Sequence, residues 1–292
     1  MTIVTDAAQA AQTPWKKRAM RMPVVRILLA ALVLSTGAFL PEAVFHSWVP
    51  KAWRPVWPEL VSALLAFYSY RLYIQRVEHR VATEVATRSA VSELGAGLGL
   101  GFMLVSAVMA VLAACGAYHL QRVNAFDLAL IEPFGLMVLV GTFEELLFRA
   151  ILFRITAQAW GERWALLVSS VLFGLAHLPG DSSTSLSIFI TVVASILLTA
   201  AYMSTGRIWL SIGIHIGWNY TLGTIWSIAV SGHEVKEGLF LGQLGGPDWL
   251  TGGAYGLEGS VVSLAVLAIA SVAMFHRRIS SGRGMAALQG RC

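Results

Sequence analysis

Eight long apolar segments run through this chain and restrict the folds that are open to it. Hydrophobic residues make up 57% of the 292 residues and charged residues only 13%, whereas about one quarter of a soluble domain is charged. The segments lack the alternation of barrel strands and are long enough for membrane helices. The sequence therefore predicts an all-α, polytopic integral membrane bundle of about eight transmembrane helices. They are expected near residues 27–45, 57–73, 95–118, 129–160, 164–178, 186–204, 208–230 and 259–275.

The positions of the basic residues predict the orientation of these helices. Cytoplasmic loops of membrane proteins carry an excess of Lys and Arg. If the chain starts in the cytoplasm, all of its 21 Lys and Arg residues lie on or near the cytoplasmic side except Lys51, Arg54, Arg122 and Lys236. Both termini are therefore expected in the cytoplasm. The net charge of +5 then reflects contact with a lipid bilayer, and no nucleic-acid partner is expected.

Two adjacent glutamates, Glu144 and Glu145, lie inside the apolar segment at 129–160, within the stretch GTFEELLFRAILFRI. An ionised carboxylate in such surroundings costs several kcal/mol unless it is paired, protonated or in contact with water. Arg149 follows Glu145 by four residues, so the two share one helix face and are expected to form a structural ion pair. A chain that carries two such carboxylates side by side is expected to use them.

Three further polar side chains lie in apolar segments. His177 is in VLFGLAHLPG, and His215 and Asn219 are in IGIHIGWNY, four residues apart and hence on one helix face. At 1.5 Å per residue, Glu144 and His177 each lie about 20 Å from the cytoplasmic end of their helices. His215 lies at about 10 Å and Asn219 at about 16 Å. These levels agree to about two helix turns, so the groups are expected to converge in one layer.

This set of side chains suits the activation of a water molecule. A carboxylate hydrogen-bonded to an imidazole can act as a general base. A second imidazole and an amide can stabilise the oxyanion that forms on a peptide carbonyl. Zinc ligation is an open alternative, because Glu and His are ordinary zinc ligands, although HExxH is absent and neighbouring glutamates on a helix point about 100° apart. A purely structural role is also open, since a lone intramembrane His is often a partner between helices.

In their order along the chain, these residues resemble the three motifs of the CPBP family, EExxxR, FxxxH and HxxxN. That family comprises the CAAX prenyl endopeptidases and related bacterial intramembrane proteins, including bacteriocin-processing and self-immunity members. The resemblance covers residues 129–230. The matching residues are Glu144, Glu145 and Arg149, then Phe173 and His177, then His215 and Asn219.

The resemblance implies a glutamic-type intramembrane endopeptidase with eight helices. It requires no cofactor, and zinc stays an alternative because older accounts of the family treat it as metal-dependent. The implied catalytic residues are Glu144 as general base, His177 as the residue that helps to bind and activate the water, and His215 and Asn219 as the oxyanion hole, with Glu145, Arg149 and Phe173 in support.

The predicted function is hydrolysis of a peptide bond in a membrane-anchored or lipid-modified peptide or protein, in a multi-pass protein of a bacterial inner or plasma membrane. The alternatives are a non-catalytic membrane scaffold or immunity protein, and a zinc-dependent version of the same protease. A proton-coupled transporter is disfavoured, because no internal repeat or broken helix is visible. The expected organisation is a basic N-terminal tail at 1–26, N-terminal transmembrane helices at 27–128, a CPBP-like catalytic core at 129–230, and an outer loop, last helix and basic C-terminal tail at 231–292.

Overall fold

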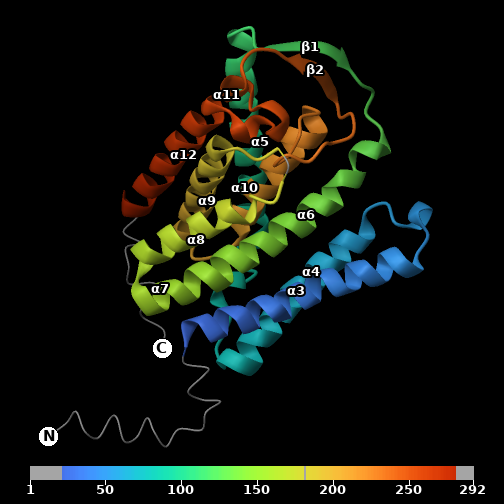
Figure 1. The fold of residues 1–292 in the computed structure, drawn as a ribbon. Coiled ribbons are helices and arrows are strands. Elements are labelled where there is room, and N and C mark those ends of the chain that lie inside the picture. Colours follow the sequence, from blue (N-terminus) through green and yellow to red (C-terminus); the bar gives the residue numbers. More distant parts are fainter. Residues whose placement is uncertain (1–21, 181, 281–292) are drawn as a thin grey trace, which may run out of the picture.

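The computed structural model describes residues 22–180 and 182–280, and this part of the chain is mostly helical (Figure 1). Most of the predicted N-terminal tail and the residues from 281 onward lie outside the described residues. The long helices are α3 (Pro23–Trp48), α4 (Trp57–Tyr73), α5 (Ala90–Ala114), α6 (Glu132–Glu145), α7 (Arg154–Trp160), α8 (Glu162–Ala176), α9 (Ser185–Thr205), α10 (Trp209–Tyr220) and α12 (Val261–Ser280).

The connections carry shorter helical elements. A short helix, α11 (Asp248–Thr251), precedes α12. Three-residue 3₁₀ turns lie at Lys51–Trp53, Thr83–Val85, Leu128–Leu130, Gly253–Tyr255 and Leu257–Gly259. Three segments are π-helical: Ile74–Glu78 extends α4, Leu146–Phe153 joins α6 to α7, and Thr221–Ile225 extends α10. Residues 132–160 therefore form one helical run with a wider turn in its middle.

Each of the eight apolar segments predicted from the sequence contains a helix. Within the described residues, four helices are long and apolar enough to cross a membrane, judged by length and composition. They are Pro23–Trp48, Ala90–Ala114, Ser185–Thr205 and Val261–Ile279. Large apolar side chains are exposed on the outer helices, among them Leu28 and Leu32 of α3 and Ile269 and Val272 of α12. Such surfaces fit contact with lipid better than contact with water.

A two-stranded sheet departs from the predicted all-helical fold. The segment predicted at 95–118 stops being helical at Ala114, because Gly116 adopts a left-handed conformation with φ +71°. Strand β1 (Tyr118–Val123) follows and pairs antiparallel with β2 (Phe240–Leu244). The predicted outer loop after residue 230 thus contains a strand, and the helix predicted to reach residue 230 ends at Ile225.

Glycines bring α5 and α10 into direct backbone contact. A Cβ atom on Gly97 of α5 would lie 2.4 Å from the Leu210 carbonyl oxygen, and one on Gly213 of α10 would lie 2.4 Å from the Leu94 carbonyl oxygen. Gly101 and Gly217 extend the same contact along both helices. The small-residue spacing of GAGLGLG, residues 95–101, therefore serves close helix packing. It fixes the helix that carries His215 and Asn219.

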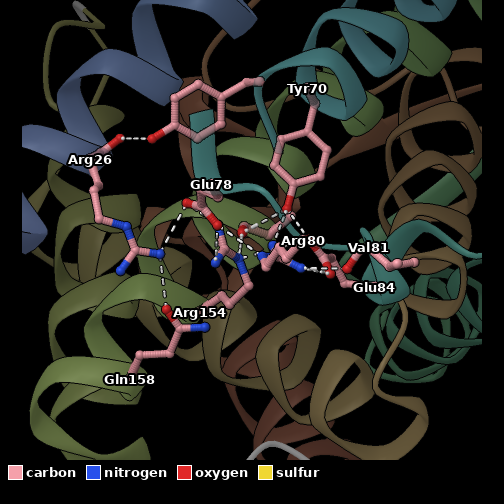
Figure 2. A network of polar contacts seen from close by, with 10 residues as sticks. Arg26, Tyr70, Glu78, Arg80, Val81, Glu84, Arg154 and Gln158 are labelled. Atoms are coloured by element: carbon pink, nitrogen blue, oxygen red, sulfur yellow. Dashed lines mark hydrogen bonds and ion pairs between the residues drawn. The ribbon is translucent and has the colours of Figure 1, made fainter. Parts of the chain in front are cut away.

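A network of ion pairs joins one end of α3, the connection after α4, and α7 (Figure 2). Glu78 accepts from Arg26 at 3.0 Å, from Arg80 at 2.8 Å and from Arg154 at 2.9 Å. Arg80 also donates to Glu84 at 2.6 Å, and Glu84 accepts a short hydrogen bond from the Tyr70 hydroxyl. Three arginines and two glutamates from three parts of the chain thus form one network, in which both carboxylates are nearly unexposed.

This network makes the stability of the fold sensitive to acid. Burial disfavours the charged form of Glu78, but Arg154 and Arg80 outweigh burial and lower its pKa from 4.5 to about 2. The pKa of Glu84 is lowered as well, because Arg80 and Arg154 outweigh its burial. A carboxyl group with a lowered pKa in the folded state stabilises the fold above its unfolded pKa. That stability is lost as the pH falls through the folded value.

We therefore expect the free energy of unfolding in detergent to decrease as the pH falls from 4.5 to about 2. Glu78→Gln should make this decrease shallower, because the substituted side chain no longer titrates. Thermal unfolding followed by circular dichroism at a series of pH values measures the effect. Glu237→Gln is the matched control, since Glu237 is in an exposed ion pair with Arg122. An equal pH dependence for the Glu78→Gln and wild-type proteins would contradict this account.

Candidate active site

Glu144 and Glu145 end α6 in the interior of the bundle, where α6, α8, α9 and α10 lie together (Figure 1). The two carboxylates differ in exposure. The Glu145 side chain is 0% exposed, and the Glu144 side chain is 22% exposed. Glu144 is therefore partly exposed, although its Oε2 is buried, and Glu145 is enclosed by protein.

Arg149 balances the buried charge of Glu145. Its Nη1 donates to Glu145 Oε1 at 2.9 Å, and both side chains are fully buried. The predicted ion pair is thus confirmed. Nη2 donates to the carbonyl oxygen of Ser195 at 3.1 Å and to its hydroxyl at 2.9 Å, and the guanidinium lies 4.7 Å from the centre of the Phe173 ring. Arg149 consequently ties the π-helical segment to α9 and α8.

His215 reaches both glutamates. Its Nδ1 lies 3.0 Å from Glu145 Oε1, within hydrogen-bond distance, and its Nε2 lies 3.8 Å from Glu144 Oε2. The Glu145 oxygen is thus shared by Arg149 and His215. The Glu144 oxygen is too far from the ring for a direct hydrogen bond but close enough for one water molecule to contact both groups. Glu144, Glu145 and His215 therefore form one electrostatic unit.

His177 lies just beyond the end of α8, as its C-cap, rather than inside a helix as the apolar sequence around it suggested. Helix ends leave carbonyl groups without helical partners. One of them, Phe173 O, accepts from His177 Nδ1 at 2.8 Å. Because a carbonyl oxygen only accepts, Nδ1 carries the proton and Nε2 of the neutral ring is free to accept. The Phe173 ring lies 4.9 Å from the His177 ring and 6.2 Å from the His215 ring.

The two histidines and Asn219 line a common pocket. Asn219 is 7% exposed and lies one turn beyond His215 on α10. The walls of the pocket include apolar side chains from α9, α10 and α12. The sequence did not point to three polar residues that also line the pocket, Thr191, Ser231 and Glu258. Glu144 is not among the lining residues. Its carboxylate is connected to the pocket by His215, whose Nε2 lies 3.8 Å from Glu144 Oε2.

A zinc ion does not fit the predicted residues in this arrangement. Among residues 22–180 and 182–280, the one group of three potential ligands whose atoms lie within 4.8 Å of one another is Glu42, His46 and Glu59. These residues belong to α3 and α4, not to the helices of the candidate site. Glu145 Oε1 and His215 Nδ1 are bound to each other, and Arg149 adds a positive charge beside them. The arrangement favours hydrogen-bond chemistry over metal coordination.

Residues 126–221 match the model of a protein family described as Rce1-like, type II CAAX prenyl endopeptidase. The match contains every residue of the three motifs, from Glu144 to Asn219. The resemblance to the CPBP family is therefore confirmed over this part of the chain. The matched family is a membrane-embedded protease family whose members act on membrane-anchored protein substrates. No curated protein and no solved structure matches the chain.

Proposed function

We propose that the protein is a glutamic-type intramembrane endopeptidase that hydrolyses a peptide bond in a membrane-anchored or lipid-modified substrate. The observation that carries this proposal is the convergence of the three motifs. His215 contacts Glu145 at 3.0 Å and approaches Glu144 at 3.8 Å, and the same His215 lines a pocket with His177 and Asn219. Imidazole and amide groups at one pocket, with a carboxylate beside one of the imidazoles, are the parts that water-mediated peptide hydrolysis needs.

The first step is the attack of water on the scissile carbonyl carbon. His177 Nε2 accepts a hydrogen bond from the water and orients it, since its Nδ1 proton is engaged by the Phe173 carbonyl. Glu144 takes the other proton as the water oxygen forms its bond to carbon. The 3.8 Å between Glu144 Oε2 and His215 Nε2 supports this role, because one water molecule can contact both groups. Glu145 Oε1 is already bound by Arg149 and His215.

The second requirement is stabilisation of the oxyanion. The Asn219 amide donates one hydrogen bond, and Nε2–H of a doubly protonated His215 donates another. With His215 doubly protonated, the two positive charges of Arg149 and His215 balance the two negative charges of Glu144 and Glu145. As Glu144 accepts the proton, its charge is replaced by that of the oxyanion, so the balance is kept in a medium where an unpaired charge is costly.

The tetrahedral intermediate then breaks down to products. The carbonyl double bond forms again, the bond between carbon and the peptide nitrogen breaks, and the nitrogen takes the proton held by Glu144. The products are one carboxylic acid and one amine, and Glu144 returns to its ionised state. No redox partner or covalent enzyme intermediate is needed, so the described side chains suffice for the reaction.

The direct experiment is cleavage by the purified full-length protein in liposomes. A farnesylated peptide with a C-terminal CAAX sequence tests lipid-modified substrates, and a reporter with one transmembrane helix tests membrane-anchored ones. Cleavage of either probe that persists after exhaustive zinc chelation supports the proposal. Cleavage of neither probe would overturn the activity, and loss of cleavage on chelation would favour the zinc-dependent alternative.

Asn219→Ala should lower kcat by about 10²- to 10³-fold, the usual cost of losing one oxyanion donor. KM should change little, because the charge that Asn219 stabilises exists only in the transition state. Steady-state kinetics on the cleaved probe measures both constants. Asn124→Ala is the matched control. Asn124 donates to the carbonyl of Gly238, just before β2, so its substitution should leave kcat unchanged. A rise in KM without a fall in kcat would assign Asn219 to substrate binding instead.

Both termini are assigned to the cytoplasmic side of a bacterial inner or plasma membrane, with all eight predicted segments as spans. Arg26 at the start of α3 donates to Gln158 of α7 at 3.0 Å. Arg278 near the end of α12 donates to Glu162 of α8 at 2.9 Å. Gln158 and Glu162 flank the tight connection between α7 and α8, so the two ends of the described chain meet there. The basic residues at this end support its cytoplasmic placement.

A further inference from the structure

A strained turn forms part of the pocket wall beside the candidate site. Val230 and His233 exchange two backbone hydrogen bonds, of 3.1 and 2.9 Å, so Ser231 and Gly232 make a two-residue turn. Both have left-handed backbones, with φ of 49° and 82°, as in a type I′ turn. Gly232 adopts this conformation freely, but for Ser231 it carries a cost. A neighbouring group is needed to hold the turn in place.

Glu258 is that group. Its Oε2 accepts from the Ser231 amide at 2.5 Å and from the Ser231 hydroxyl at 2.9 Å. Its Oε1 accepts from the indole Nε1 of Trp218 at 3.2 Å. The turn is also held through Gly232, whose amide donates to the Tyr255 carbonyl at 2.9 Å. One carboxylate therefore receives three donors from two separate parts of the chain.

These contacts connect three segments around one pocket. Glu258 lies in the 3₁₀ turn that leads into α12, Trp218 lies on α10, and Ser231 lies in the connection that follows α10. All three line the pocket that also contains His215 and Asn219. Trp218 immediately precedes Asn219, so the orientation of its indole and that of the Asn219 amide depend on the same turn of helix. Glu258 thus contacts Trp218, the residue directly before the proposed oxyanion donor Asn219.

We infer that Glu258 is a positioning residue for the reaction, acting through Trp218 and the Ser231–Gly232 turn. It keeps the pocket wall closed against α10 and fixes the turn of helix that presents Asn219. This role rests on the proposed function. A carboxylate is required because all three partners are donors, and Glu258 offers acceptor atoms only. A glutamine would direct an NH₂ group at one of them and open the contact without changing the size of the side chain.

The test compares Glu258→Gln and Trp218→Phe, separately and together, with the same liposome probes. Glu258→Gln is expected to lower kcat roughly 10- to 100-fold, the scale of a small misplacement in an active site, with KM nearly unchanged. Trp218→Phe should give a smaller loss in the same direction. The double variant should be no slower than Glu258→Gln alone, because both changes break one contact. Glu237→Gln, in an exposed ion pair of the same outer segment, should match the wild-type protein.

A second readout does not depend on catalysis. Hydrogen–deuterium exchange of a peptide covering residues 229–233 should be faster in Glu258→Gln than in the wild type, because the Ser231 amide loses its acceptor. Unchanged exchange there overturns the inference whether or not either probe is cleaved. A wild-type kcat in Glu258→Gln, or a change in KM alone, also overturns it. If the wild-type protein cleaves neither probe, the proposed function fails, and the positioning role falls with it even where exchange shows that Glu258 holds the turn.

Discussion

Glu144→Gln is expected to remove nearly all peptide cleavage, lowering kcat by about 10²- to 10⁴-fold, the range that general bases contribute. The amide has the shape of the carboxylate but cannot accept a proton from water at neutral pH. The loss should appear in kcat and kcat/KM alike, since the proton transfer belongs to the transition state. Purified protein in liposomes, assayed on the farnesylated and the transmembrane probes, gives both constants.

The fold should survive this substitution. Glu144 is 22% exposed, and its Oε2 has no hydrogen-bond partner within the described parts of the chain. Neutralising it therefore breaks no direct hydrogen bond at that oxygen. With Glu144 neutral, His215 can release its second proton and leave no unpaired charge, so thermal unfolding of the variant is expected to match that of the wild type. Glu132→Gln, on the same helix and in an ion pair with Lys236 at the surface, is the control that should keep both activity and stability.

This substitution also separates the protease from a non-catalytic scaffold or immunity protein. A scaffold uses the polar cluster to hold its helices, so it would keep its function when Glu144 becomes glutamine and the fold is intact. A protease would lose function with no change in stability. Full turnover in a folded Glu144→Gln protein would show that the mechanism proposed for Glu144 is wrong.

Much of the candidate site could be predicted from the sequence, because its information is local. A spacing of four residues in a helix puts Glu145 beside Arg149, and the structure gives 2.9 Å between their charged atoms. The same spacing puts His215 and Asn219 on one face of α10, and both line the pocket. Charged or polar groups in apolar segments are costly, and this cost alone drew attention to them. The depth estimate put Glu144 and His215 about 10 Å apart in level, whereas their side chains approach to 3.8 Å.

The partners of these groups depend on tertiary structure and could not be predicted. The π-helical segment Leu146–Phe153 shifts the hydrogen-bond register after the glutamates, and the apolar composition there is equally compatible with a regular α-helix. His215 was expected near Glu144, yet its hydrogen bond is to Glu145. His177 was placed inside a helix, but α8 ends at Ala176. Glu258 lies 40 residues from Trp218 in sequence, so no spacing rule connects them.

Strand β1 illustrates the same limit. Residues 118–123 follow an apolar helix without a charged break, so hydropathy alone extended the segment to Tyr118. The positive φ of Gly116 ends the helix, and the pairing of β1 depends on β2 more than 100 residues later. A two-stranded pairing of this kind has no local sequence pattern when the partner is remote. The helices were therefore predictable from the sequence. The sheet formed by the connections after α5 and after α10 was not.

Arg149→Met is expected to cause the largest loss of stability of any substitution proposed here, about 3–5 kcal/mol, the usual cost of breaking a fully buried ion pair from one side. Glu145 would keep its charge in a place with no exposure, with the neutralising guanidinium gone and His215 beside it at 3.0 Å. The contacts of the guanidinium with Ser195 and the Phe173 ring would also be lost. Unfolding in mixed detergent micelles measures the free energy of unfolding.

Two further variants make this result interpretable. The double variant Glu145→Gln/Arg149→Met should recover part of the lost stability, because no uncompensated charge is left buried. Arg122→Met, which breaks an exposed ion pair with Glu237, should cost at most about 1 kcal/mol. If Arg149→Met were no more destabilising than Arg122→Met, Glu145 would have to be neutral in the folded protein. The balance of two carboxylates against Arg149 and His215 would then be wrong, and with it the source of the proton that His215 is proposed to direct at the oxyanion.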